Sequence, residues 1–392
     1  MSDSVVIVGM ARTAIGGMMG MYSELSAQQL GASAIRAAIE EAGISSSEVD
    51  EVIMGCVLPA GSGQAPARQA ALAAGIDKRV PCTTLNKVCG SGMRTVMMAH
   101  DAIKAGSASV VIAGGMESMT NAPYLIPKAR AGYRFGHAEL LDHMLFDGLQ
   151  DAYEGGPMGA FGELCADKYQ FSREDQDAYS IESLRRANEA IETGKFKREI
   201  SDVVVSTRKG ETICSTDEQP GNARADKIPL LKPAFKKDGT ITAANASSIS
   251  DGAAALVLMS RTEADRRGLK ILATIKGHSH FAQEPEWFTT APVGALNNLL
   301  QKLDWTADDV DLFEINEAFA VVTMAAMKEL DLPHDKVNVH GGACALGHPL
   351  GCSGARIIVT LLGAMETYDK KSGIASLCIG GGEATAIAIE RS

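Results

Sequence analysis

Short apolar runs of strand length alternate along the chain with apolar positions at helical spacing. Residues 4–9, 110–115 and 253–259 are apolar runs that predict buried strands. The stretch from Ser91 is read as a glycine-rich loop followed by an apolar helix, and helices are also predicted over 163–169 and 173–192. Ser172, with Asp175 three residues later, caps the last of these. Such alternation predicts an α/β fold with mostly parallel sheets covered on both faces.

One order of elements occurs twice. Residues 45–55 match residues 306–316, because each begins with a capping-box pair and then runs into an apolar strand. Residues 91–117 and 351–383 share the order glycine-rich loop, helix, turn and strand, in which Glu117 matches Glu383. We interpret the chain as two duplicated α/β halves packed with pseudo-twofold symmetry. Chance similarity of two generic α/β units is the alternative.

A stretch of different character separates the halves. It contains most of the tyrosines, and from 205 to 250 it is irregular and rich in turn signals. We therefore predict an N-terminal half over 1–118 with 251–269, an inserted loop domain over 119–250 that binds the substrate, and a C-terminal half over 270–392. Under the pseudo-twofold arrangement, the loops that enter corresponding helices of the two halves meet.

Composition and charge narrow the function classes. The 392 residues are 46% hydrophobic with 40 glycines, enough to build sizeable cores in more than one domain. A net charge of -11 argues against nonspecific binding to nucleic acid or anionic membranes. No apolar segment approaches the roughly 18 residues of a membrane span, and a strand begins almost at the first residue. We expect a cytoplasmic protein whose eight cysteines are free thiols, with no metal site.

Two thiols and one imidazole lie in glycine-rich stretches beside apolar elements. They are Cys89 in Asn86-Lys-Val-Cys-Gly-Ser-Gly, His348 in Gly-His-Pro-Leu-Gly, and Cys378 in Leu-Cys-Ile-Gly-Gly-Gly. A cysteine nucleophile reacts as its thiolate, and a helix N-terminus or a neighbouring imidazole can lower the thiol pKa from about 8.5 toward neutrality. This combination of residues is suited to nucleophilic chemistry. The alternative is that all three are buried residues in tight turns.

Together with Asn245-Ala-Ser, Asn316-Glu-Ala-Phe and Gly341-Gly-Ala-Cys-Ala-Leu-Gly-His-Pro, these motifs resemble the thiolases along essentially the whole chain, within them the acetyl-CoA acetyltransferase branch. The resemblance implies a thiolase-like fold of two α/β halves with an inserted loop domain. It implies reversible joining of two acetyl-CoA molecules to acetoacetyl-CoA and CoA, without a further cofactor. It also implies a homo-oligomer, either a dimer or a tetramer.

The resemblance assigns the catalytic roles. Cys89 would carry the acyl group and His348 would accept its proton, while Cys378 would remove the α-proton of the second acetyl-CoA. His348 and a water on Asn316 would stabilise the enolate oxygen, and the backbone N–H groups of Cys89 and Gly380 would stabilise the tetrahedral intermediate. Without its motif, Asn316 would be read as a turn or cap residue.

The resemblance also places residues along the path of pantetheine and acyl group. These residues are Leu149, Met158, Phe235, Ala243, Ser247, Ala318 and Phe319, and the apolar ones could equally be core of the inserted domain. The chain departs from the biosynthetic members at Pro157, where they have histidine, and at Pro220, where they have arginine. Arg224 is our candidate for the missing phosphate contact, with a solvated loop arginine as the alternative. Phe288 and Tyr179 match residue types of potassium-activated relatives, which leaves a bound potassium ion open.

Three other functions compete with the acetyltransferase. A broader 3-ketoacyl-CoA thiolase of fatty-acid degradation differs only in chain length. A ketoacyl synthase shares duplicated halves and a nucleophilic cysteine, but Cys378 and the inserted domain argue against it. A nonenzymatic acyl-CoA binder is disfavoured because every catalytic position is filled.

Overall fold

The computed structural model describes residues 3–208 and 210–391, so the outermost residues of the predicted terminal domains lie outside it. The first half contains β1 (Val5–Thr13), β2 (Gly16–Gly17), α1 (Ala27–Ala42), β3 (Glu51–Gly55), α2 (Pro66–Ala73), β4 (Cys82–Leu85), α3 (Ser91–Lys104), β5 (Val110–Ser118) and β11 (Ser250–Ser260). After α7 (Arg261–Arg267) come β12 (Ala273–Ala282), α8 (Ala291–Leu303), β13 (Leu312–Ile315), α9 (Ala320–Glu329), α10 (Ala343–Leu346), α11 (Leu350–Thr367), β14 (Ser372–Ile379) and β15 (Glu383–Glu390).

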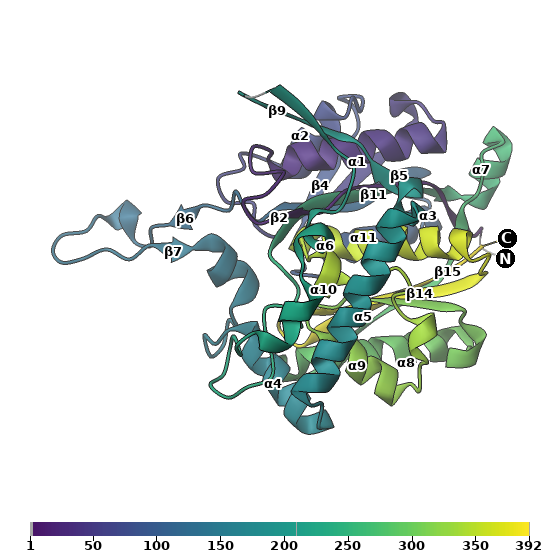
Figure 1. Cartoon of the computed structure of the whole chain (residues 1–392). Coiled ribbons are helices and arrows are strands. Elements are labelled where there is room, and N and C mark those ends of the chain that lie inside the picture. The colour runs from purple at the N-terminus through teal and green to yellow at the C-terminus, as the bar shows by residue number, and fades with distance from the viewer. Residues whose placement is uncertain (1–2, 209, 392) are drawn as a thin grey trace.

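The strands of the two halves belong to one continuous sheet, and the helices that cover it lie in three layers (Figure 1). Its order is β13-β14-β15-β12-β1-β11-β5-β3-β4, and the two halves join where β1 pairs with β12. Helix α1 packs on β1 and β11 of the first half, and α8 packs on β12 and β15 of the second. Helices α3 and α11 pack against each other and against strands of the sheet, so they form the middle layer.

The two halves repeat each other strand by strand, as the duplication predicted. In the first half β1 is antiparallel to β11, β11 is antiparallel to β5, and β5 is parallel to β3. The second half has the same order and directions: β12 is antiparallel to β15, β15 is antiparallel to β14, and β14 is parallel to β13. Both predicted capping boxes are present, at Ser45 and at Thr306.

Three details of the sequence-based prediction are wrong. The sheet is mixed and not mostly parallel, because β11 and β15 each run antiparallel to both neighbours. The apolar run expected as one strand up to Glu383 is two strands, since residues 380–382 form a tight turn and such a short connection forces an antiparallel pair. The strand pairing also changes the match between the halves: Val52 pairs with Ile112, and its counterpart Phe313 pairs with Ile374. Ile112 therefore corresponds to Ile374, and Glu117 corresponds to Ile379 rather than to Glu383.

Glycines allow α3 and α11 to approach each other at backbone distance. A Cβ built on Gly92 of α3 would lie 2.7 Å from the backbone nitrogen of Ala355 in α11. A Cβ on Gly354 would collide with the backbone of Met93 in α3. Real side chains cannot occupy such positions without moving a helix, so the glycines fix how closely the two helices cross. One core cluster surrounds this crossing and draws on both halves.

The segment between β5 and β11 contains its own elements: β6 (Tyr124–Leu125), β7 (Leu141–Asp142), α4 (Met158–Tyr169), α5 (Arg173–Glu192), β8 (Ile200–Ser201), β9 (Val203–Thr207), β10 (Gly210–Cys214) and α6 (Glu218–Asn222). Helix α5 has the predicted bounds and the predicted cap at Ser172, while α4 begins five residues earlier than predicted.

The fully buried Arg12 of β1 anchors the segment, because it pairs with Glu199 at 2.6 Å and Asp217 at 2.7 Å.

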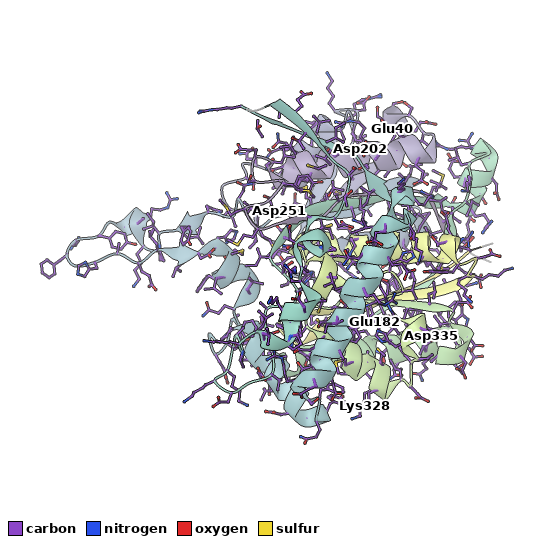
Figure 2. All side chains as sticks on the ribbon, in the orientation of Figure 1. Glu40, Glu182, Asp202, Asp251, Lys328 and Asp335 are labelled. Atoms are coloured by element: carbon purple, nitrogen blue, oxygen red, sulfur yellow. The ribbon has the colours of Figure 1, made fainter. Side chains whose placement is uncertain are left out.

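One part of this segment projects from the body. Residues 120–142, here called the arm, contain the small β6–β7 hairpin and extend away from the sheets (Figure 1). Exposed charged side chains such as Glu40, Lys328 and Asp335 cover the outside of the body (Figure 2), whereas the arm exposes Tyr124, Ile126, Tyr133, Phe135 and Leu140. Across the described part of the chain, no helix combines the length and the apolar character that a membrane crossing requires.

Candidate active site

Cys89 lies on a strained turn directly before α3. Val88 has a positive φ of 46°, which is rare for a β-branched residue, and its N–H donates to the Asn86 side chain at 2.8 Å. The N–H groups of Gly380 and of Cys89 itself donate to the Cys89 thiol and favour its thiolate. Burial outweighs them and raises the pKa of Cys89 to about 11. The thiol pKa is therefore raised rather than lowered, because removing the thiolate from water costs more free energy than the two N–H groups return.

His348 lies in the corresponding position of the second half, just before α11. Its backbone N–H donates to the Ser248 carbonyl at 3.1 Å, and its Nδ1 lies 2.6 Å from the Ser353 hydroxyl oxygen. Its Nε2 is buried and has no hydrogen-bond partner within the described part of the chain. Burial, with a smaller effect from the Arg356 charge, lowers the pKa of His348 to about 3. The imidazole is therefore neutral near pH 7 and can accept a proton.

Cys378 and Asn316 lie deeper than Cys89 and His348. Cys378 is near the carboxyl end of β14, fully buried in an apolar cluster with Phe288, Ala318 and Phe319. Burial raises the pKa of its thiol well above the usual value, and the proximity of Cys89 raises it further. Asn316 follows β13, and its amide nitrogen is buried without a partner. Both carry polar atoms that a substrate or water could satisfy.

An apolar cavity of about 400 Å³ lies beside Cys89 and His348, whereas Cys378 and Asn316 are buried behind it and are not among its lining residues. Cys89, His348 and Gly380 line it together, which brings the two predicted helix entrances to one place. The seven residues predicted for the pantetheine and acyl path all line it as well: Leu149, Met158, Phe235, Ala243, Ser247, Ala318 and Phe319. The Ser247 hydroxyl donates to the Ala318 carbonyl at 3.0 Å, so its oxygen is left to accept a further hydrogen bond. Met119, Leu145 and Ile249 also line the cavity, and no sequence motif identified them.

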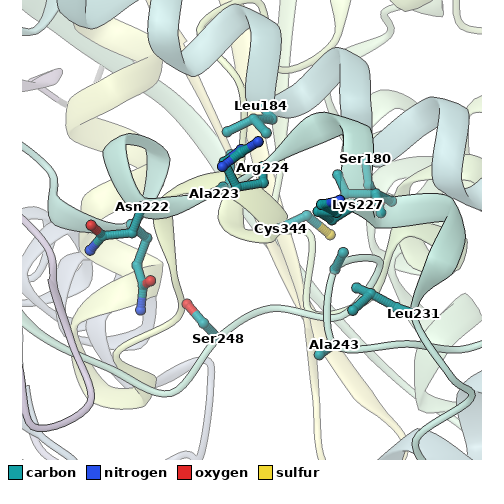
Figure 3. Close-up of a pocket in the computed structure, with 14 residues that line it drawn as sticks. Ser180, Leu184, Asn222, Ala223, Arg224, Lys227, Leu231, Ala243, Ser248 and Cys344 are labelled. Atoms are coloured by element: carbon teal, nitrogen blue, oxygen red, sulfur yellow. The ribbon is translucent and has the colours of Figure 1, made fainter.

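A second pocket of about 350 Å³ continues from this cavity, because Ala243 and Ser248 line both (Figure 3). Arg224 and Lys227 bring two positive charges to it. Arg224 is exposed, forms an ion pair with Asp226 at 3.3 Å, and lines this second pocket rather than the catalytic cavity.

Glu117 holds backbone segments next to the site, and the sequence analysis did not identify it as functional. Its buried carboxylate accepts backbone hydrogen bonds from Val57 at 2.9 Å, Leu58 at 3.1 Å and Gly351 at 2.8 Å. The last contact holds the first turn of α11, directly after His348. Burial raises the pKa of Glu117 to about 7, against these bonds. An acidic residue inside the apolar strand β5 was the available signal.

Further polar residues have structural partners. Tyr179 is buried and donates to Glu317 at 2.9 Å, while Phe288 lines the cavity. Away from the cavity, His100, Asp101 and His278 lie close enough to share a metal ion. Both imidazoles already contact the Asp101 carboxylate, at 3.0 and 2.9 Å. Burial lowers the pKa of both histidines, and the positive charge of Lys302 lowers it further and would oppose a cation there.

Comparison with known proteins places this geometry in a family. The thiolase N-terminal domain matches residues 5–262, and the thiolase C-terminal domain matches residues 269–391. The chain is 51% identical to an acetyl-CoA acetyltransferase of Chromobacterium violaceum, covering 99% of each sequence. It is 52% identical to acetyl-CoA acetyltransferase 2 of Arabidopsis thaliana, covering 98% of this chain and 96% of that protein. The crystal structure of Acat5 thiolase from Ascaris suum in complex with coenzyme A superposes with a TM-score of 0.94 at 43% identity, covering 99% of this chain and 100% of the other. The predicted fold class is confirmed.

Proposed function

Because the chain belongs to the thiolase family, we propose that it is an acetyl-CoA C-acetyltransferase that converts two acetyl-CoA into acetoacetyl-CoA and CoA, reversibly. The observation that carries the proposal is the meeting of the Cys89 thiol, the unpartnered Nε2 of neutral His348 and the Gly380 N–H at one apolar cavity. Relatives named acetyl-CoA acetyltransferase match along nearly the full length. A related thiolase was crystallised with coenzyme A, which supports a CoA thioester as the substrate.

In the first half-reaction, Cys89 becomes acetylated. His348 Nε2 takes the thiol proton as the sulfur attacks the acetyl carbonyl, and the N–H groups of Cys89 and Gly380 receive the negative oxygen that forms. When the carbon–sulfur bond to CoA breaks, the imidazolium returns the proton to the departing CoA thiolate. Because burial raises the pKa of the Cys89 thiol, proton transfer to His348 accompanies the attack rather than preceding it.

In the second half-reaction, Cys378 acts as the base. It passes its proton to His348 and removes the α-proton of a second acetyl-CoA, and its raised pKa makes its thiolate a strong base. The His348 imidazolium and a water held by the Asn316 amide stabilise the enolate oxygen. The enolate carbon then attacks the acetyl group on Cys89, and the released Cys89 thiolate recovers the proton from His348. Apart from this water, these steps use side chains and backbone groups of the chain, with CoA as substrate and product.

We further propose that CoA extends from the cavity into the pocket beside Arg224. The apolar lining fits pantetheine, and the two cations at the second pocket fit the CoA phosphates. Pro157 cannot make the pantetheine contact of the histidine in the biosynthetic members, and Pro220 cannot make the phosphate contact of their arginine. Arg224 and Lys227 supply positive charge at the second pocket in place of that arginine. Exchange of the Asp226 partner for a phosphate would free the Arg224 guanidinium.

The arm supports a homo-oligomeric assembly. Phe135 at its tip is fully exposed, and Tyr124, Ile126 and Leu140 each expose more than half of their surface. A projecting hairpin with several exposed large apolar side chains is costly in water unless another subunit covers it. We propose that arms of different subunits contact each other. Phe135→Asp should lower the assembly size measured by light scattering while the fold is kept; an unchanged mass would contradict this role of the arm.

Turnover of purified protein across a panel of 3-ketoacyl-CoA substrates tests the proposed activity. We expect acetoacetyl-CoA to give the highest kcat/KM for thiolysis by CoA, and acetyl-CoA alone to yield acetoacetyl-CoA. Preference for long chains would instead favour the broader 3-ketoacyl-CoA thiolase. Acceptance of acyl groups from a carrier protein but not from CoA would favour a ketoacyl synthase, and no turnover with any thioester would refute an acyltransferase.

A further inference from the structure

Two side chains at the site each present one buried polar atom without a hydrogen-bond partner among the described residues: Nε2 of His348 and Nδ2 of Asn316. In both cases the opposite end of the side chain is held by helix α11. Ser353 holds His348, and Arg356, one helical turn further on, holds Asn316. Both α11 residues are fully buried. Neither was identified from the sequence, although an arginine inside an apolar helix is a signal that a buried partner exists.

Ser353 decides which nitrogen of His348 carries the proton. Its hydroxyl lies 2.9 Å from the Pro349 carbonyl and 2.6 Å from His348 Nδ1. A carbonyl oxygen only accepts, so the single hydroxyl proton goes to Pro349 and the serine oxygen accepts from Nδ1–H. The neutral imidazole therefore keeps its proton on Nδ1, and its lone pair is on Nε2 at the cavity.

Arg356 decides which way the Asn316 amide faces. Its guanidinium donates to Glu314 at 2.9 Å and to the Asn316 side-chain oxygen at 3.5 Å. A flipped amide would set its N–H₂ group against the guanidinium N–H groups, donor against donor, in a buried space. The observed orientation leaves the amide nitrogen free for a water or an oxyanion.

We propose that Ser353 and Arg356 are positioning residues that keep the His348 Nε2 lone pair and the Asn316 amide N–H directed at the reacting groups. The proposal rests on the proposed acetyltransferase function and deepens it. Ser353 can accept from Nδ1–H whether His348 is neutral or protonated, so every proton that His348 gains or loses moves at Nε2. The Arg356 contact with Asn316 serves the step that forms an enolate oxygen, while the Arg356 charge also lowers the pKa of His348.

Ser353→Ala tests the first half of the proposal, with Thr360→Ala as the matched control. Thr360 is also fully buried on α11, and its hydroxyl donates to Glu199 at 3.0 Å, a residue outside the proposed site. In Ser353→Ala we expect the rate of Cys89 acetylation and kcat to fall at least about tenfold, because the imidazole can adopt the wrong tautomer. KM for acetyl-CoA should stay within about twofold. Thr360→Ala should keep wild-type kinetics.

Arg356→Lys tests the second half. Lysine keeps the positive charge beside Glu314. Its compact ammonium group replaces the planar guanidinium, whose two terminal nitrogens donate to Glu314 and Asn316. Exchange of acetyl-CoA α-protons with deuterated water should fall at least about tenfold, while acetylation of Cys89 changes less than about twofold. If this variant is not recovered folded, the pair Arg356→Met with Glu314→Gln removes both buried charges and takes the same two measurements.

The proposal is overturned if Ser353→Ala matches Thr360→Ala in kcat and acetylation rate. It is also overturned if the Arg356 variant loses acetylation and α-proton exchange equally, since that pattern reports a general loss of structure. Wild-type turnover of acetyl-CoA is measured in the same series. Its absence would refute the proposed function itself, so the two failures are distinguishable.

Discussion

Cys378→Ala is the sharpest test of how the two reactive cysteines divide the chemistry, because the chain contains its own control. Cys378 and Cys165 are both fully buried in the same apolar cluster. Replacing either by alanine deletes one sulfur atom and leaves a small cavity, at a cost of about 1–2 kcal/mol in the free energy of unfolding. Both variants should therefore fold, with similar decreases in Tm.

Their activities should differ strongly. Loss of a catalytic base lowers the rate by about 10²- to 10⁴-fold, which corresponds to about 3–5 kcal/mol in the activation barrier. Cys378→Ala should lose this much in condensation, since no other thiol shares its place at the end of β14. Acetylation of Cys89 should persist, because His348 and Gly380 are untouched. Cys165→Ala should retain both reactions.

Three measurements separate the steps. Intact mass spectrometry after incubation with acetyl-CoA reports the acetyl group on Cys89, and proton NMR in deuterated water reports exchange of the α-protons. Production of acetoacetyl-CoA reports the complete reaction, and circular dichroism confirms the fold. A Cys378→Ala protein with native structure, normal acetylation and near-normal condensation would refute the assigned role. Failure of acetylation would show that Cys378 also shapes the first half-reaction.

The remaining predictions concern the nucleophile, the phosphate contact and acid stability. Cys89→Ala should abolish acylation and turnover, and acetylation of another active-site thiol in this variant would contradict the assignment. Arg224→Ala should raise KM more for CoA esters than for pantetheine esters; equal effects would make it a surface residue. Burial lowers the pKa of His340 to about 4, so the unfolded chain takes up its proton first, near pH 6.5. The free energy of unfolding should fall by up to about 3 kcal/mol as pH drops from 6.5 to 4, and urea titrations of His340→Phe should show a shallower decline; an unchanged slope would exclude His340 as the cause.

Much of the fold could be predicted because local signals agreed with the global pattern. The capping box at Ser172 gave the bounds of α5, and the paired boxes at Ser45 and Thr306 revealed the duplication. Strand direction could not be predicted in the same way. The long segment before β11 hides where that strand inserts, and only the three-dimensional arrangement shows that it lies between β1 and β5.

The positions of the site residues could be predicted where glycines indicate a tight turn. Properties that depend on burial, such as the thiol pKa, could not. The glycine-rich stretches around Cys89 and His348 predict tight turns at the starts of two helices. The thiol pKa was not predictable, since the desolvation that raises it depends on everything packed around the sulfur. Ser353 and Arg356 act through contacts made on folding, and their positions on a helix otherwise read as core.

The glycine crossing of α3 and α11 limits how the two halves can diverge. The nucleophile and its proton acceptor precede different helices, and Gly92 and Gly354 set the spacing between those helices without touching any reacting group. A half taken from a distant relative, joined between residues 262 and 269, would bring its own helix surface to this crossing. We expect such chimeras to be active only when both helix surfaces come from sequences that evolved together, even if every catalytic residue is retained.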